Sequence, residues 1–176
     1  MVTDELRAFL AQIDTAFLAT ASADGQPYVQ HRGGPKGFLR ALDDHTIGFL
    51  DLAGNRQYLT VGNLRENERV SLFLMDYARR RRVKVWGTAR AVPLTDELRA
   101  ALALPGRVRP ERAILITVTR WDINCPAHIP QKLDAQDVKA AIERYEAHNA
   151  ELEARIAELE AQLAALTTGT AAVAHR

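Results

Sequence analysis

The sequence predicts a mainly β protein, an antiparallel barrel or sandwich, followed by a long C-terminal α-helix that forms a coiled coil. Short runs rich in apolar and β-branched residues come in pairs joined by turn residues, which is typical of hairpins. Few segments between them have helical periodicity, so a parallel sheet with crossover helices is not expected. The last part of the chain carries a heptad repeat instead.

The first predicted element is a short helix that covers the sheet. Residues 3–5, Thr-Asp-Glu, have the pattern of an N-cap followed by an acidic first turn. Apolar residues then recur at helical spacing from Leu6 to Ile13, so that they share one face.

The strand-like runs follow in hairpins. Asp24 and Gly25 form a typical two-residue hairpin turn, and a basic turn at residues 78–82 separates a later pair. We expect the arginines of that turn to be solvated, with Arg82 as the exception. The predicted strands are residues 16–22, 27–32, 37–42, 45–51, 69–77, 83–92 and 113–121.

Two short helices are predicted between the strands. Residues 56–66 have too many polar side chains and too little alternation for a strand, although Gly62 weakens the helical pattern. Residues 95–97, Thr-Asp-Glu, cap a second helix that runs to about Leu104, where the segment LPGRVRP ends it.

The C-terminal segment has a heptad pattern. Apolar or register residues recur from Val138 in alternating steps of four and three. Position a holds Ile142, Asn149, Ile156 and Leu163, and position d holds Val138, Tyr145, Leu152, Leu159 and Leu166. Isoleucine at a and leucine at d favour two parallel helices, and Asn149 can pair with its own copy. Arg155 at g then faces Glu160 at e of the partner. The alternative is a single amphipathic helix folded back on the barrel.

These patterns divide the chain into three parts. Residues 1–131 are the predicted barrel domain, residues 132–168 the coiled-coil helix, and residues 169–176 a disordered tail. We expect a homodimer, and a larger assembly results if the barrel and the coiled coil pair different copies.

The composition argues against several classes of protein. The 23 Lys and Arg residues against 22 Asp and Glu leave a net charge of +1, so neither a nucleic acid nor an acidic membrane is an expected partner. The single cysteine, Cys125, cannot form an internal disulfide and fits a reducing cytoplasm. No apolar run approaches the roughly 20 residues that a membrane-spanning helix needs, and the charged N-terminus is unlike a signal peptide. We expect a cytoplasmic protein.

One interruption of the strands predicts a phosphate site. The stretch AGNRQ places Gly54 at a strand end and then Asn55, Arg56 and Gln57 where a helix begins. The free amides of a first helical turn, a guanidinium and a side-chain amide together suit one phosphate. An ordinary capped helix with solvated polar residues is the alternative.

A second interruption predicts a site for a flat ring. The stretch HRGGPKGF places Arg32 at a strand end, before Gly33, Gly34 and Pro35. Backbone without side chains lets a ring approach and bind to it. A wide turn that needs glycine only for its conformation is the alternative.

At these residues the chain resembles the flavin-binding split-barrel family related to pyridoxamine 5′-phosphate oxidase. The likeness covers roughly residues 5–131, and it is most specific in the stretch GNRQYLTVGNL. The resemblance implies a six-stranded antiparallel split barrel and a homodimer that holds FMN in clefts between its subunits.

The resemblance also assigns roles to residues. Arg32 and Gly33 to Pro35 would line the isoalloxazine ring, with Asp51 beside it at the strand end. Asn55, Arg56 and Gln57 would hold the phosphate. Two further residues, Arg82 and Lys84, match positions that approach the flavin or its phosphate.

Departures from the family concern the substrate. The oxidase itself has an Arg-x-Val-Leu-Leu-Lys strand and an Arg-Leu-x-Pro element, where this chain has glycines and the stretch WDINCPAHIPQ. Pyridoxine phosphate is therefore not the expected substrate. Trp121, Cys125 and His128 are candidates for the substrate wall, although packing or backbone hydrogen bonds explain the same residues. No further acidic or histidine cluster accompanies them, so we expect no metal site.

The expected function is that of an FMN-dependent oxidoreductase that transfers electrons or hydride to or from a small organic substrate. No catalytic residue is identified. Three alternatives remain at this point: a deazaflavin-dependent reductase in the same fold, a non-enzymatic flavin-binding or sensor protein, and an interaction module without a cofactor.

Overall fold

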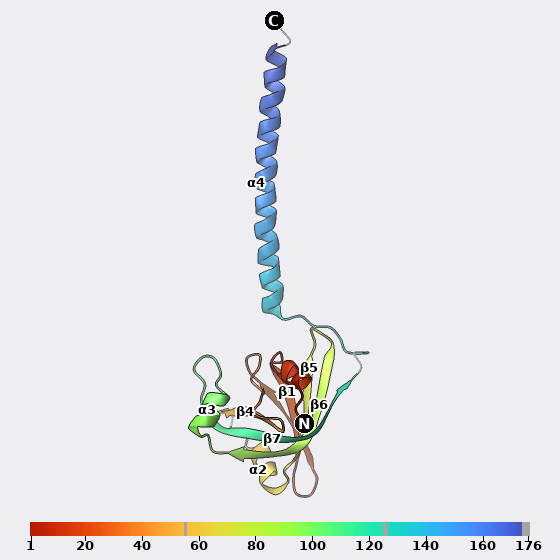
Figure 1. Ribbon diagram of the computed structural model, residues 1–176, viewed down its shortest axis with the longest axis vertical. Helices are drawn as coiled ribbons and strands as arrows, with labels where there is room; N and C mark the ends of the chain where they lie inside the picture. Colours follow the sequence, from red (N-terminus) through yellow and green to blue (C-terminus); the bar gives the residue numbers. More distant parts are fainter. Residues whose placement is uncertain (55, 125–126, 174–176) are drawn as a thin grey trace. The chain divides into compact units, whose positions relative to one another are not determined.

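The structure is a computed structural model, and it describes residues 1–54, 56–124 and 127–173. Two of the predicted site residues, Asn55 and Cys125, therefore lie outside the described residues. The chain divides into two compact units, Met1–Gln131 and Lys132–Arg176. The first unit contains a seven-stranded antiparallel sheet with short helices, and the second contains one long helix (Figure 1).

The predicted mainly β fold is confirmed. Each of the seven predicted runs contains a strand, which is one strand more than the six-stranded barrel that the resemblance implies. The strands are β1 (Thr15–Ala21), β2 (Pro27–Gly33), β3 (Arg40–Ala41), β4 (Thr46–Leu52), β5 (Arg69–Asp76), β6 (Arg81–Val92) and β7 (Pro110–Asn124). The sheet order is β2-β1-β5-β6-β7-β4-β3. The shortest strand, β3, keeps only two residues of the predicted run 37–42. Gly37 has a φ of 78°, and the buried side chains of Phe38 and Leu39 turn into the core before pairing begins.

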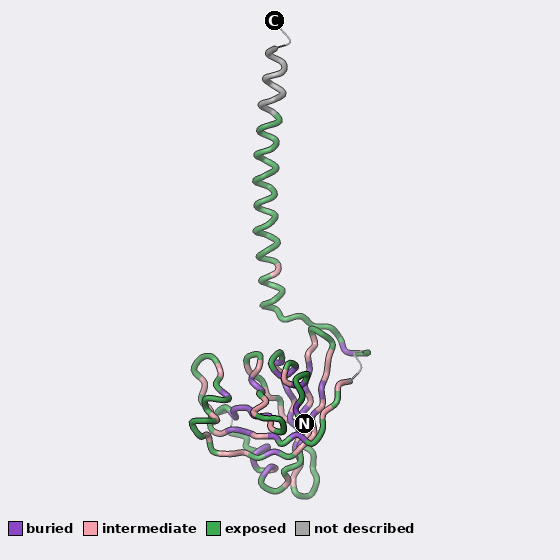
Figure 2. The backbone as a smooth tube through the Cα atoms, in the orientation of Figure 1, coloured by how far each residue is buried: buried purple, intermediate pink, exposed green. Residues whose placement is uncertain are grey.

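Alternating burial along the strands builds one core. In β1, Ala16, Leu18 and Thr20 are buried and alternate with partly exposed residues, as one covered face of a sheet requires. β5 and β6 continue this face with Leu72, Leu74, Val83 and Val85. Figure 2 shows the buried positions gathered within the strands of the first unit.

The sheet curls so that its ends meet. β2 is the first strand of the sheet order and β4 is the last but one. Arg32 on β2 nevertheless donates a hydrogen bond from Nη1 to Oδ1 of Asp51 on β4, at 2.7 Å. A flat sheet could not bring these side chains together, so the contact marks the closing seam of the barrel.

The predicted covering helix is confirmed as α1 (Asp4–Leu10). The Thr3 hydroxyl accepts a hydrogen bond from the Leu6 backbone N–H at 3.4 Å, which is the expected N-cap. Leu6, Phe9 and Leu10 are buried against the core, so the apolar face covers the barrel as the spacing predicts.

The helix α3 (Asp96–Ala101) begins at its predicted Thr95 cap but ends before Leu104. Arg40 explains the early end. Its guanidinium donates hydrogen bonds to the carbonyl oxygens of Ala101 and Ala103 at 3.0 and 2.7 Å, so a distant side chain satisfies groups at the helix C-terminus. A local sequence pattern cannot reveal such a partner.

The helix α2 (Leu59–Glu66) begins three residues after its predicted start at Arg56. Arg56 has a φ of 60°, in the left-handed region, and a residue in that conformation cannot belong to a right-handed helix. Arg56 and Gln57 therefore lie in the segment before the helix, not in its first turn.

Three arginines of the basic turn between β5 and β6 contact other parts of the chain. Arg79 pairs with Asp76 at 3.1 Å, and Arg81 lies 3.4 Å from the Glu5 carboxylate. Arg80 donates a hydrogen bond from Nε to the carbonyl oxygen of Ile129 at 3.0 Å. Arg79 and Arg80 are exposed, as expected of a solvated turn, and Arg81 is half-buried. All three arginines also form contacts within the chain.

The second unit contains α4 (Ala135–Val173). This helix continues past the predicted end at residue 168, and residues 174–176 lie outside the described residues. Between residues 135 and 163 every residue is exposed except Ala141, which is half-buried. Figure 2 shows this part of the helix almost entirely in the colour of exposed residues. Among the described helices, none has the length and apolar composition that crossing a bilayer requires.

Candidate functional site

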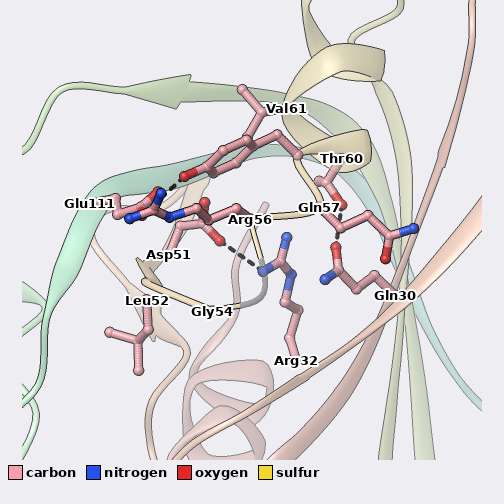
Figure 3. Close-up of a pocket in the computed structure, with 11 residues that line it drawn as sticks. Gln30, Arg32, Asp51, Leu52, Gly54, Arg56, Gln57, Thr60, Val61 and Glu111 are labelled. Atoms are coloured by element: carbon pink, nitrogen blue, oxygen red, sulfur yellow. Dashed lines mark hydrogen bonds and ion pairs between the residues drawn. The ribbon is translucent and has the colours of Figure 1, made fainter.

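The two predicted interruptions meet at one pocket, which Figure 3 shows in close-up. The pocket has a volume of about 50 Å³ and lies between the ends of β2 and β4, the segment that leads into α2, and the beginning of β7. Its lining includes Arg32, Asp51, Arg56 and Gln57 of the predicted site. The other lining residues are Gln30, Leu52, Gly54, Tyr58, Thr60, Val61 and Glu111.

Asp51 is the buried acid of this pocket, with a side chain that is 9% exposed. It lies between two guanidinium groups. Arg32 donates the 2.7 Å hydrogen bond to Oδ1, and Arg112 Nε lies 3.4 Å from Oδ2, at ion-pair distance but without hydrogen-bond geometry. Buried carboxylates need such partners, so Asp51 fixes both arginines at the seam.

The segment before α2 is pinned to β7 through Tyr58. The Tyr58 hydroxyl donates a hydrogen bond to Glu111 Oε1 at 3.2 Å. Arg112 places its guanidinium carbon 5.0 Å from the centre of the Tyr58 ring and donates from Nη2 to Glu111 at 2.6 Å. These contacts define the position of the left-handed residue Arg56, two residues earlier in the chain.

α2 itself is anchored to the first hairpin. The Thr60 hydroxyl donates a hydrogen bond to Gln30 Oε1 on β2 at 2.7 Å, and Asn63 Nδ2 donates to the Thr20 hydroxyl on β1 at 2.9 Å. Thr60 and Thr20 are both buried. Buried polar groups that satisfy one another fix a unique arrangement, so the helix holds its N-terminal segment at the pocket.

The pocket and its surroundings carry one more positive charge than negative charges. The positive groups are Arg32, Arg56 and Arg112, and the negative groups are Asp51 and Glu111. Both carboxylates form ion pairs with Arg32 or Arg112. Arg56 is exposed, and among the described residues its side chain has no ion-pair or hydrogen-bond partner. Arg32 Nε is buried and also lacks a hydrogen-bond partner. Both donors suit an anionic or carbonyl-bearing ligand.

A second pocket adjoins the first, with Arg32 and Leu52 lining both. It has a volume of about 150 Å³, and it lies beside the glycines of the predicted ring site. Phe49 forms part of its wall, and the Arg32 guanidinium lies 5.7 Å from the centre of the Phe49 ring. The remaining lining residues are His31, Gly33, Phe38 and Leu50.

The two glycines of the predicted ring site are explained by packing within the chain. A Cβ on Gly34 would lie 2.7 Å from Phe38 Cβ, and a Cβ on Gly33 would lie 2.9 Å from the His31 ring. Gly33 lines the second pocket, whereas Gly34 does not. Pro35 accepts a hydrogen bond at its carbonyl oxygen from the Phe38 backbone N–H, at 2.9 Å, and so belongs to the turn after β2.

Arg82 and Lys84 do not line either pocket. They alternate along β6 with the buried residues Val83 and Val85, so they occupy the face of the sheet opposite the core. Lys84 lies directly across from Phe73 of β5. Within one chain these two cations therefore do not contribute to the walls of the two pockets.

The predicted substrate-wall residues lie elsewhere as well. Trp121 lies across from Val85, packs against the core, and donates a hydrogen bond from its indole N–H to the Met1 carbonyl oxygen at 3.1 Å. His128 is exposed and has a φ of 65°. Neither residue lines the two pockets. Within residues 1–54, 56–124 and 127–173, no three His, Cys, Asp or Glu side chains gather as a metal site requires.

Three residues that position the site are not predicted from the sequence. They are Tyr58, Glu111 and Arg112, although Tyr58 follows directly after Gln57. Arg112 is paired with Asp51 across β4 and β7. Since these residues are 61 positions apart, only the strand register could reveal their contact.

Comparisons with known proteins bear on the family and the fold. A family model described as pyridoxamine 5′-phosphate oxidase matches residues 2–125. The structure of HupZ from Group A Streptococcus is 22% identical, with a TM-score of 0.54, and the match covers 70% of this chain and 94% of that chain. The structure of an FMN-binding protein from Syntrophomonas wolfei is 13% identical, with a TM-score of 0.50, covering 68% and 83% respectively. At these identities the two structures show a common fold. Comparison with curated proteins gives no match.

Proposed function

Because the chain belongs to the pyridoxamine 5′-phosphate oxidase family, we propose that it is an FMN-dependent oxidoreductase that transfers electrons or hydride to or from a small organic substrate. We also propose that it acts in the cytoplasm. The observation that carries the proposal is that Arg32 and Arg56, from two interruptions of the chain, line one pocket at the seam of the barrel. The same fold is found in the FMN-binding protein from Syntrophomonas wolfei.

The phosphate of FMN fits the end of the pocket at Arg56. Arg56 supplies a positive charge that the described residues leave unpaired, and Gln57 lies beside it in the lining. Tyr58 and α2 hold this segment in place, so that little order has to be gained when a phosphate binds. A planar guanidinium on a fixed backbone is suited to bind a phosphate through two parallel hydrogen bonds.

The ring of FMN fits the second pocket, next to Arg32. The buried Nε–H of Arg32 can donate a hydrogen bond to a ligand, because it has no acceptor among the described residues. The hydrogen bond to Asp51 keeps the guanidinium at the pocket and out of the solvent. When bound, FMN supplies the redox chemistry itself. The role of this chain is to orient the ring and to place positive charge beside it, which favours the anionic reduced form.

We propose that a second copy of the chain completes the site. Pockets of about 50 and 150 Å³ are smaller than the roughly 300–1,000 Å³ typical of ligand sites. The face of the sheet opposite the core supports pairing, because Phe17, Phe73 and Lys84 form one row across three strands. Val29 on β2, which faces the same side, is 58% exposed. In a homodimer through this face, Arg82 and Lys84 would reach the cofactor of the partner.

The visible absorption spectrum of the purified protein, and then of its heat-released ligand, tests the proposal. The expected result is released FMN in a ratio near one per chain. A deazaflavin spectrum without ordinary flavin bands would show that the cofactor is a deazaflavin coenzyme and not FMN. A colourless protein that does not bind added FMN would contradict a flavin function of either kind.

The variant Arg56→Ala tests the phosphate site. We expect FMN affinity to fall by about tenfold to a hundredfold, because a charge-assisted contact is worth about 1.5–3 kcal/mol. Arg99→Ala, on the exposed surface of α3, is the matched control and should leave affinity unchanged. Turnover of the FMN-loaded protein with nicotinamide donors then separates an oxidoreductase from a flavin-binding sensor.

A further inference from the structure

α4 exposes a continuous apolar stripe. Seven of its apolar residues, all at predicted a or d positions, have exposed fractions between 39% and 72%. They are Val138, Ile142, Tyr145, Leu152, Ile156, Leu159 and Leu163. Large apolar side chains exposed together, and repeated at heptad spacing, mark a surface that is covered by another helix.

We propose that the partner is a second copy of α4, aligned parallel and in register to form a two-stranded coiled coil. This inference does not depend on the proposed flavin chemistry, because all its residues lie between 135 and 173. The mixture of Ile142 and Ile156 at position a with Leu152 and Leu159 at position d is the combination that favours two parallel helices.

The charges beside the stripe select the same orientation. In a parallel pair, a g residue faces the e residue five positions later in the other helix. Arg155 then faces Glu160 of the partner subunit, and His148 faces Glu153 of the partner subunit. The first pair joins opposite charges and supports the parallel arrangement, and the second adds an ion pair when His148 is protonated.

An antiparallel pair would bring like charges together. In that orientation, e positions face e positions and g positions face g positions. The e positions of the central heptads are all acidic, at Glu146, Glu153 and Glu160, while the g positions His148 and Arg155 are both basic. Facing residues of equal sign destabilise the pair, so the acidic e positions and Arg155 disfavour this alternative.

The ion pairs within one helix do not prevent this exchange. Arg155 lies 2.5 Å from Glu158, and His148 lies 3.9 Å from Glu151, each within the same helix. Their side chains are more than half exposed, and exposed pairs contribute little. Arg155 and His148 can therefore turn toward the partner helix at small cost, or bind both carboxylates together.

Asn149 adds a register constraint. It occupies an a position between Ile142 and Ile156, where an amide is buried in a coiled coil. In the parallel, in-register pair it meets its own copy, and the two amides can hydrogen-bond to each other. A shift by one heptad would bury each amide against an apolar side chain, which costs free energy.

Disulfide formation in the full chain tests the orientation. Cys125→Ser removes the native thiol, and Tyr145→Cys at a d position or Leu163→Cys at an a position then places one thiol in the apolar stripe. In the parallel pair each variant meets its own copy, so both should form covalent dimers under mild oxidation. In an antiparallel pair a positions face d positions, so position 145 would lie across from position 163 of the other helix. Identical thiols would then be roughly 27 Å apart, and only a mixture of the two variants would cross-link.

Two matched controls complete the experiment. Ala147→Cys and Ala161→Cys lie at f positions, on the outer face, and should stay monomeric on a denaturing gel. Cross-linking that depends on the mixture, or that is equal at stripe and f positions, would overturn the proposal. The proposal would also be overturned if the helix signal melted at the same temperature in Ile156→Glu as in the outer-face variant Ala154→Glu, because only Ile156→Glu places a charge between the two helices.

Discussion

Arg32 and Asp51 join the first strand of the sheet order to the last strand but one, through a 2.7 Å hydrogen bond between side chains that are 14% and 9% exposed. Four strands separate β2 from β4 in that order. The pair is therefore both a seam of the barrel and a wall shared with the candidate cofactor site. A fold that closes at its functional site couples stability to binding, because a change in one partner exposes the charge of the other.

Asp51→Asn should destabilise the protein strongly. Removing the carboxylate leaves Arg32 without its buried partner and Arg112 without its ion pair, and breaking a buried pair costs about 3–5 kcal/mol. The matched control is Asp44→Asn. Asp44 also accepts from an arginine at 2.7 Å, but it is 75% exposed, and such pairs contribute about 0–1 kcal/mol. Urea unfolding of both variants checks the difference, and equal losses would contradict the assigned role.

Tyr58→Ala should weaken FMN binding without direct contact to the phosphate. The ring and hydroxyl of Tyr58 hold the segment of Arg56 against Arg112 and Glu111. Without them Arg56 has to be ordered on binding, and we expect a loss of about tenfold in affinity, or about 1.4 kcal/mol. Tyr58→Phe keeps the ring over Arg112 and should stay close to wild type. Fluorescence titration with FMN measures both, and equal effects would show that the ring is not the important part.

Local signals in the sequence predicted local structure well. The Thr3 and Thr95 caps, the hairpin at Asp24, and the meeting of Arg32, Arg56 and Gln57 at one pocket all follow from short patterns or from the family resemblance. The remaining features depend on distant partners. Arg40 binds carbonyl oxygens at the end of α3, which belong to residues 61 and 63 positions later in the sequence. Position 34 requires glycine because a Cβ there would collide with Phe38. The start of α2 depends on the φ of a single residue, which no periodicity encodes.

Two glycines should respond in opposite directions to alanine. Gly87 lies at the register shift between β6 and β7, where an added Cβ would be 2.0 Å from the Thr117 carbonyl oxygen. Backbone cannot yield as a side chain does, so Gly87→Ala should cost about 3 kcal/mol or more. Gly62 lies within α2 with nothing within 4 Å of the added atom, and Gly62→Ala should stabilise the protein by about 0.5–1 kcal/mol. Thermal unfolding of the two variants distinguishes the cases, and a loss at Gly62 would mean that space near α2 is needed.

Asn149→Val should raise the stability of the α4 pair and reduce its specificity. A valine at this a position replaces two amides in the seam by apolar side chains, which favours association of the helices. The same change removes the residue that penalises a shifted register, so alternative pairings become accessible. We expect a higher melting temperature of the helix signal, together with a broader mass distribution in light scattering after chromatography. Ala147→Val, at an outer f position, is the control for the lower helix propensity of valine. If Asn149→Val melted lower than that control, the amide would have to be exposed or bound elsewhere, and the parallel in-register pair would be the wrong arrangement.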